Sequence, residues 1–163
     1  MHETVSARRP ARAAAALACA VAVLAGPAVA GCAGQARAAH VPASAVARLT
    51  AVARRAATVN GDHAPAWATA VATTRAKALT SATPGDTVPG AAGTRVFLVT
   101  MLGRFTAYDS SPPSGAALPT GRYLSLVVDA RTFEVLDSGL SAKPPPVAPA
   151  SLGPVTYLIR PGH

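Results

Sequence analysis

The chain has 163 residues and carries 15 lysine and arginine residues against 7 aspartate and glutamate residues, a formal net charge of +8. Half of the residues are hydrophobic and 4% are aromatic, which suits one small core but not a surface of stacked aromatics for nucleic acid. The basic residues are scattered, and this favours a solvated basic surface or a general attraction to anionic membrane or cell-wall polymer.

The first 31 residues have the pattern of a bacterial export signal. Three arginines, Arg8, Arg9 and Arg12, precede an uncharged apolar run over residues 13–25 that is too short to span a bilayer. A Gly-Pro pair then ends any helix, and the small residues after it leave the chain extended for a peptidase. We therefore predict that residues 1–31 are a signal peptide.

The segment Val29-Ala30-Gly31-Cys32 closes the apolar run and resembles the lipobox of bacterial lipoproteins. The resemblance implies cleavage between Gly31 and Cys32, a diacylglyceryl anchor (with palmitate among its acyl chains) on the Cys32 thiol, and retention on the extracytoplasmic face of the cell membrane. The alternative is an ordinary signal peptide cut after Ala30, which gives a secreted protein without lipid. Arg8-Arg9 leaves open whether export is by the general secretory or the twin-arginine route.

Cys32 is the only cysteine after the leader, because Cys19 lies within the apolar run. We therefore expect no intramolecular disulfide and no cysteine-based metal site. The remaining 132 residues carry 12 basic and 6 acidic side chains. Their length predicts a short tether over residues 32–41 and a single domain over residues 42–163.

Residues 42–60 are predicted to form a helix. Pro42 suits the first turn, and Asn60-Gly61 supplies a left-handed stop. The apolar residues at helical spacing are Val46, Leu49, Val52 or Ala53, Ala56 and Val59. Because this stripe is one-sided, we expect the helix to pack on a sheet.

Asp62-His63 follows the helix as an adjacent acid and imidazole without a nucleophile or metal ligand beside it, so we expect a capping or turn role.

Residues 66–79 fit two structures. Alternation of alanines with larger residues predicts a strand whose alanine face lies under the helix, whereas an alanine-rich run after Pro65 permits a helix. The β-branched residues favour the strand. Residues 80–93 are rich in breakers and predict a loop.

The second half of the chain predicts an antiparallel sheet. Residues 94–108 and 121–130 alternate as strands, with Gly103 marking a bulge in the first. Residues 133–140 return as a hairpin partner, and residues 155–159 add an edge strand. The inward side of the second strand is expected to be Leu124, Leu126 and Val128. The proline-rich residues 143–149 are expected to run extended as a spacer.

The expected fold class is α+β, with one N-terminal helix packed on a curved antiparallel sheet of about four strands. This layout resembles the cystatin-like fold. Leu126-Val127-Val128-Asp129-Ala130, Thr132 and Glu134-Val135-Leu136 echo the PepSY pattern v-v-D-a-x-T-G-e-V. Phe133 replaces the glycine of that pattern, and a left-handed phenylalanine is strained by about 1–2 kcal/mol. Either the turn changes shape or the resemblance is to the fold alone.

The chain also resembles small uncharacterised lipoproteins of high-G+C bacteria, through Thr73-Thr74-Arg75 and Leu152-Gly153-Pro154-Val155-Thr156. That resemblance implies no known activity. The cystatin-like and PepSY resemblances imply inhibition or assembly of an envelope protein.

The sequence contains no Gly-x-Ser-x-Gly, His-Glu-x-x-His or phosphate-cradling glycine loop, so we do not expect an enzyme, a cofactor or a metal. A non-catalytic binding or interaction module fits better, held at the membrane by its anchor and able to meet an envelope protein. Trp67, Tyr108 and Tyr123 are candidate contacts, with core packing as the alternative for Trp67. The other candidate function is a small-ligand carrier with a pocket between helix and sheet.

Overall fold

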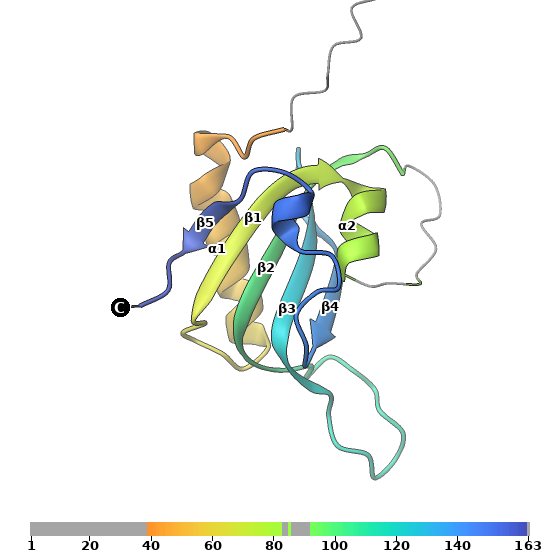
Figure 1. Ribbon diagram of the computed structural model, residues 1–163. Coiled ribbons are helices and arrows are strands. Elements are labelled where there is room, and N and C mark those ends of the chain that lie inside the picture. The colour runs from red at the N-terminus through yellow and green to blue at the C-terminus, as the bar shows by residue number, and fades with distance from the viewer. Residues whose placement is uncertain (1–38, 83–84, 86–91, 163) are drawn as a thin grey trace, which may run out of the picture. The chain divides into compact units, whose positions relative to one another are not determined.

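The computed structural model describes residues 39–82, 85 and 92–162 (Figure 1). The predicted leader, Cys32 and most of the predicted tether lie outside the described residues. The elements in chain order are α1 (Ala43–Val59), β1 (Trp67–Thr74), α2 (Arg75–Ala82), β2 (Arg95–Thr106), β3 (Thr120–Asp129), β4 (Val135–Ser141), the 3-10 turn η1 (Pro149–Ser151) and β5 (Thr156–Ile159).

The strands form one antiparallel sheet in the order β4-β3-β2-β1-β5. The α+β class and the antiparallel sheet are therefore confirmed. The sheet has five strands where about four were expected, and the edge strand predicted over residues 155–159 is present as β5, which pairs with the free side of β1. The expected extended run after β4 carries the chain across the sheet and ends in the short turn η1.

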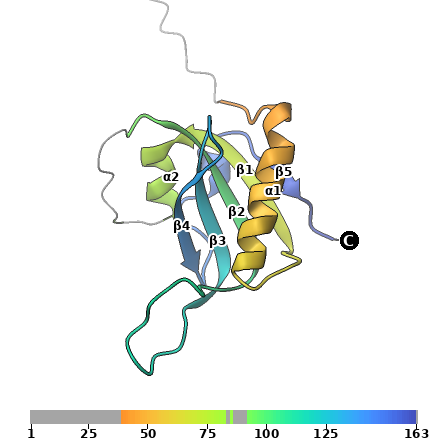
Figure 2. The same ribbon diagram turned by 180° about the vertical axis from the view of Figure 1, so that it is seen from behind.

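Helices cover both faces of the sheet. Figure 2 shows α1 lying over one face, and Figure 1 shows α2 and the segment around η1 on the other. The predicted inward residues of β3, Leu124, Leu126 and Val128, are buried in the core with α1. Val127 points to the opposite face and packs with Leu79 of α2. The alternation expected for this strand is confirmed, and each face has its own apolar cluster.

The stripe expected on α1 is confirmed at Leu49 and at Ala53, the alternative to Val52, and differs at its other positions. The buried residues recur every fourth position, and they are Ala45, Leu49, Ala53 and Ala57. Val52 and Ala56 are only partly buried, and Val59 is 59% exposed, so its expected inward position was wrong. The reason lies in β1, whose face toward α1 consists of alanines, Ala68, Ala70 and Ala72. Small residues on both elements fill the centre of this contact, and the larger Val46 and Val52 are left partly buried at its flanks.

Residues 66–79 divide between the two structures that the sequence permitted. The strand ends at Thr74, with its alanine face under α1 as expected, and the helix α2 begins at Arg75 inside the segment for which the strand was favoured. The backbone N–H groups of Arg75 and Ala76 bond to the carbonyls of Thr94 and Ala92 at 2.9 and 3.1 Å. Two of the free donors at the helix start are thus satisfied by the chain leading into β2, so no capping side chain is needed.

The turn between β3 and β4 keeps a left-handed residue at the position of Phe133, whose φ is 65°. Among the described residues it is the one non-glycine residue with positive φ. Its ring lies 5.9 Å from that of Phe97, and the guanidinium carbon of Arg48 sits 3.9 Å from its centroid. An aromatic pair and an exposed cation–π contact are each worth about 1 kcal/mol. These contacts offset the strain of about 1–2 kcal/mol.

Asp129, the last residue of β3, stabilises the same turn through its side chain. Its Oδ1 accepts hydrogen bonds from the backbone N–H groups of Thr132 at 2.9 Å and Arg131 at 2.8 Å. These two bonds lower the pKa of the Asp129 carboxyl below its usual 3.8. The bond from Thr132 has the larger effect, and the bond from Arg131 has the next largest. Because the folded-state pKa is lowered, the carboxylate stabilises the fold above its ordinary pKa, and this stabilisation is lost as the pH falls through the folded-state value.

We predict that Asp129→Ala lowers the free energy of unfolding by about 1–2 kcal/mol at pH 7, because two turn donors lose their acceptor. The difference from the unsubstituted protein should narrow as the pH falls from about 5 to about 2, because the native carboxylate is then protonated. Urea denaturation across this pH range measures both effects. Asp109→Ala is the matched control, since Asp109 is exposed. A difference that is constant with pH would contradict this account of Asp129.

A cleft lined by two arginines

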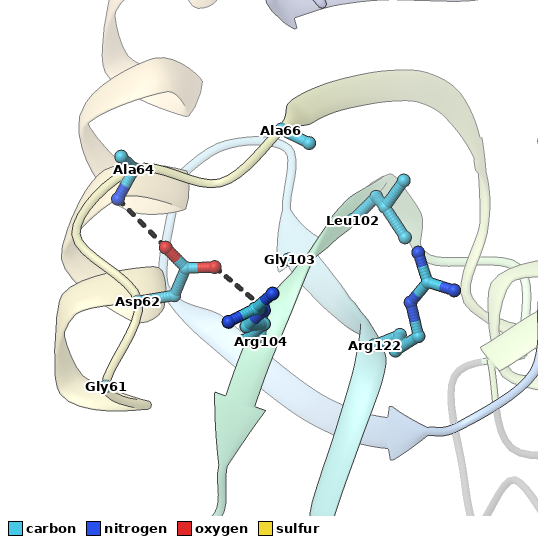
Figure 3. Close-up of a pocket in the computed structure, with 8 residues that line it drawn as sticks. All are labelled: Gly61, Asp62, Ala64, Ala66, Leu102, Gly103, Arg104 and Arg122. Carbon is cyan, nitrogen blue, oxygen red and sulfur yellow. Dashed lines mark hydrogen bonds between the residues drawn. The ribbon is translucent and has the colours of Figure 1, made fainter.

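A cleft of about 560 Å³ opens at the end of the sheet where α1 stops (Figure 3). We call it the arginine cleft. Its lining residues are Gly61, Asp62, Ala64, Ala66, Leu102, Gly103, Arg104 and Arg122. They come from the loop between α1 and β1 and from neighbouring positions on β2 and β3. The cleft therefore brings together residues that are far apart in the sequence.

The loop that forms one wall is set by the end of α1. Gly61 has a φ of 84°, as the predicted left-handed stop requires. The carbonyl of Asn60 accepts the backbone N–H of Thr106 at 2.8 Å, and the N–H of Ala66 donates to the carbonyl of Leu102 at 2.8 Å. Both bonds join the loop to β2, so the wall is fixed at its two ends.

Asp62 ties this loop to the opposite wall. Its Oδ1 accepts the backbone N–H of Ala64 at 2.9 Å, and its Oδ2 accepts the backbone N–H of Arg104 at 2.7 Å. The expected turn role of Asp62 is confirmed by the first bond. The second bond, across to β2, was not foreseen. His63, its sequence neighbour, is exposed.

Gly103 is required for the bond between Asp62 and Arg104. A Cβ atom at this position would collide with Oδ2 of Asp62 and would stand 2.8 Å from the ring of Phe105. The register of β2 against β3 also shifts between Leu102 and Phe105, which confirms the irregularity predicted at this glycine. The missing side chain thus lets the carboxylate approach the backbone of the strand.

The three predicted aromatic contacts lie next to residues that line the cleft. Trp67 and Tyr123 both pair with Leu102 in the sheet, on its two sides, and their rings meet edge to face at a centroid distance of 6.4 Å. Both are partly buried. Tyr108 is 60% exposed, and its ring lies against Gly61 on the other wall. The structure thus brings Trp67 and Tyr123 into contact and leaves Tyr108 apart from them.

Arg104 and Arg122 are the residues of this cleft that the sequence did not single out. Both are exposed. Over the described part of the chain, the one ion pair joins Arg75 and Asp137 at 3.0 Å, so neither cleft arginine is neutralised by an acid. Gly103 predicted a bulge in β2. The sequence did not predict the register of β2 against β3, which places Arg122 opposite this bulge.

A second surface depression, the α1–β4 groove, has a volume of about 370 Å³. It runs beside α1 where β4 forms the edge of the sheet. Its lining residues are Val52, Arg55, Ala56, Val59, Asn60, Leu126, Phe133, Glu134, Val135 and Ser138. Val59 and Val135 are 59% and 46% exposed, so the groove has an apolar floor and rim.

The described residues contain no group of three or more histidine, cysteine, aspartate or glutamate side chains placed to hold a metal ion. Within the same residues, neither helix is long and apolar enough to cross a membrane. No protein family model, no curated protein and no solved structure matches this chain.

We predict that Gly103→Ala lowers the free energy of unfolding by about 1–3 kcal/mol, because the new methyl group displaces the Asp62 carboxylate. Gly93→Ala is the matched control, since a Cβ there meets nothing within 4 Å. Chemical denaturation of both variants measures the difference. Equal stability of the two variants would show that the close approach of Asp62 to β2 is unimportant.

Proposed function

We propose that the protein is a lipid-anchored binding module on the extracytoplasmic face of the cell membrane, and that the arginine cleft is its binding site. The anchoring half of the proposal rests on the leader pattern over residues 1–31 and on Cys32, which lies outside the described residues. A diacylglyceryl group on this thiol would hold the domain at the bilayer through the segment before α1.

The position of the cleft is the observation that supports the binding half most strongly. The chain reaches α1 at Pro42, and the 17-residue helix then runs to Val59 beside the cleft. A helix of this length rises by about 25 Å. The two ends of α1 lie at opposite ends of the domain (Figures 1 and 2), and the cleft is lined by Gly61 and Asp62, just after the end of the helix. An anchor before residue 42 would leave the cleft open to molecules on the far side.

The hydrogen bonds of Asp62, the acidic residue that lines the cleft, support binding without catalysis. Both oxygens of Asp62 accept backbone N–H groups, so the carboxylate is engaged in holding the loop. The charged side chains that line the cleft and are free to meet a ligand are Arg104 and Arg122, and arginine is favoured at recognition sites.

We also infer a cystatin-like arrangement of the helix and the sheet, supported by the order of α1 before the antiparallel strands. This likeness, together with the PepSY-like turn at Asp129 and Thr132, supports an envelope protein as a partner that the module inhibits or helps to assemble.

A small-ligand carrier is the second candidate, and the α1–β4 groove is the observation in its favour. Its volume of about 370 Å³ falls within the usual range for small-molecule sites. Chemical-shift mapping separates the two functions, because a carried apolar ligand would move signals of Val52 and Val135, whereas a ligand of the arginine cleft would move those of Ala64 and Gly103.

We predict that Cys32→Ala abolishes incorporation of radioactive palmitate and releases the protein into the medium or leaves the precursor uncut. The thiol of Cys32 would be the only attachment point for the lipid, so no other residue replaces it. Cys19→Ala is the matched control, because this cysteine lies in the segment expected to be removed and its loss should leave labelling unchanged. Palmitate incorporation into Cys32→Ala at the unsubstituted level would end the anchoring proposal.

A further inference from the structure

Arg104 and Arg122 are cross-strand neighbours at a β-bulge. Leu102 pairs with Tyr123, and the next pair is Phe105 with Gly121. Two residues of β2, Gly103 and Arg104, therefore face one residue of β3, Arg122. Bulges redirect side chains at the ends of sheets and beside binding sites. Both arginines also line an adjoining depression of about 330 Å³, so the pair stands between two hollows.

The charges of this pair are not compensated within the described part of the chain. Like charges on adjacent strands repel and destabilise a sheet. Asp62 is the one acid among the lining residues, and its two oxygens accept backbone N–H groups. Neither guanidinium group makes an ion pair or a hydrogen bond to the described residues, in contrast to Arg75 with Asp137. In Figure 3 the guanidinium of Arg122 extends along the cleft toward Leu102. An anion placed between the arginines would relieve their repulsion.

A ring system is available beside the charges. Leu102 lines the cleft and pairs in the sheet with Trp67 on one side and Tyr123 on the other, and the rings of these two residues meet edge to face. Partly exposed aromatic rings give large contact areas at little cost in side-chain entropy. The strands that line the cleft, β2 and β3, have partners on both sides, so they offer no free backbone edge to an extended peptide. These features favour a compact ring-bearing ligand over a peptide strand.

We propose that the arginine cleft binds an acidic saccharide. Its carboxylate or phosphate groups pair with Arg104 and Arg122, and its sugar rings rest on Leu102 and the Trp67–Tyr123 pair. The planar guanidinium group matches both kinds of acidic group in a two-bond geometry. This inference rests on the proposed function, because it names the ligand class of the same cleft. The carboxylate and the phosphate share this chemistry, and separate probes distinguish them.

The test is isothermal titration of the full-length chain in detergent with trigalacturonate as the carboxylate probe and glucose 6-phosphate as the phosphate probe. Maltotriose is the uncharged control. We expect saturable binding of at least one acidic probe, weakened as salt rises, and no binding of maltotriose. The acidic probe that binds identifies the group. Absence of binding by both acidic probes, or equal binding of maltotriose, would overturn the inference.

Substitutions of Arg104 and Arg122 test whether these two arginines bind the acidic probe. Arg104→Gln keeps the backbone N–H that Asp62 accepts, and Arg122→Gln changes an exposed side chain, so both variants should fold. Each should weaken binding about tenfold. Arg54→Gln, on the exposed side of α1, is the matched control and should bind as the unsubstituted chain does. An equal loss in all three would indicate diffuse charge attraction and overturn the site.

Failure of this test is separable from failure of the anchoring proposal. The cleft does not include Cys32, so Cys32→Ala should retain full affinity for the acidic probe even where it abolishes palmitate labelling. Loss of affinity in Cys32→Ala would contradict a site confined to the cleft.

Discussion

The contact between two alanine surfaces sets the geometry of this domain. Ala53 and Ala57 on α1 face a strand whose inward residues are also alanines, and all of them are fully or almost fully buried. Because these small side chains are buried in a close-packed core, a larger residue at the centre of the contact would have to displace its neighbours. Leu49 is the one larger residue in the central stripe of α1. The bulky residues of β2 and β3 complete the core beside this contact.

The end of α1 at Asn60-Gly61 positions the loop that forms one wall of the cleft. The helix stops at Val59, and the carbonyl of the next residue bonds to β2 at Thr106. The loop then crosses to β1 with the Asp62 carboxylate bonded to the backbone of Arg104. Each wall of the cleft is therefore held by backbone hydrogen bonds, while the arginine side chains remain exposed. The proposed binding of an anionic ligand uses this arrangement, because exposed cationic groups stand on a frame held by hydrogen bonds.

The parts of the fold with local patterns were predictable from the sequence. Alternation identified β2 and β3, and Asn60-Gly61 identified the end of α1. The helix α2 was predicted only as the less favoured alternative for residues 66–79, and its start at Arg75 could not be located from the sequence because its first donors bond to the chain before β2. The buried stripe of α1 was predicted correctly at Leu49 and left open between Val52 and Ala53, and the other positions were misplaced because valines are more often core residues than alanines unless the facing strand is also made of alanine. The arginine pair depends on a register between β2 and β3, and register is set by the tertiary structure.

The most direct test of the alanine contact is the free energy of unfolding of Ala53→Leu compared with Ala51→Leu. Ala53 is 0% exposed against the sheet, whereas Ala51 is exposed on the same helix. Both substitutions introduce a strong helix former, so helix propensity cancels in the comparison. The close contact predicts a loss of about 1–3 kcal/mol for Ala53→Leu and a change within about 0.5 kcal/mol for Ala51→Leu. Equal stabilities would contradict the account, because they would mean that α1 has room to spare above β1.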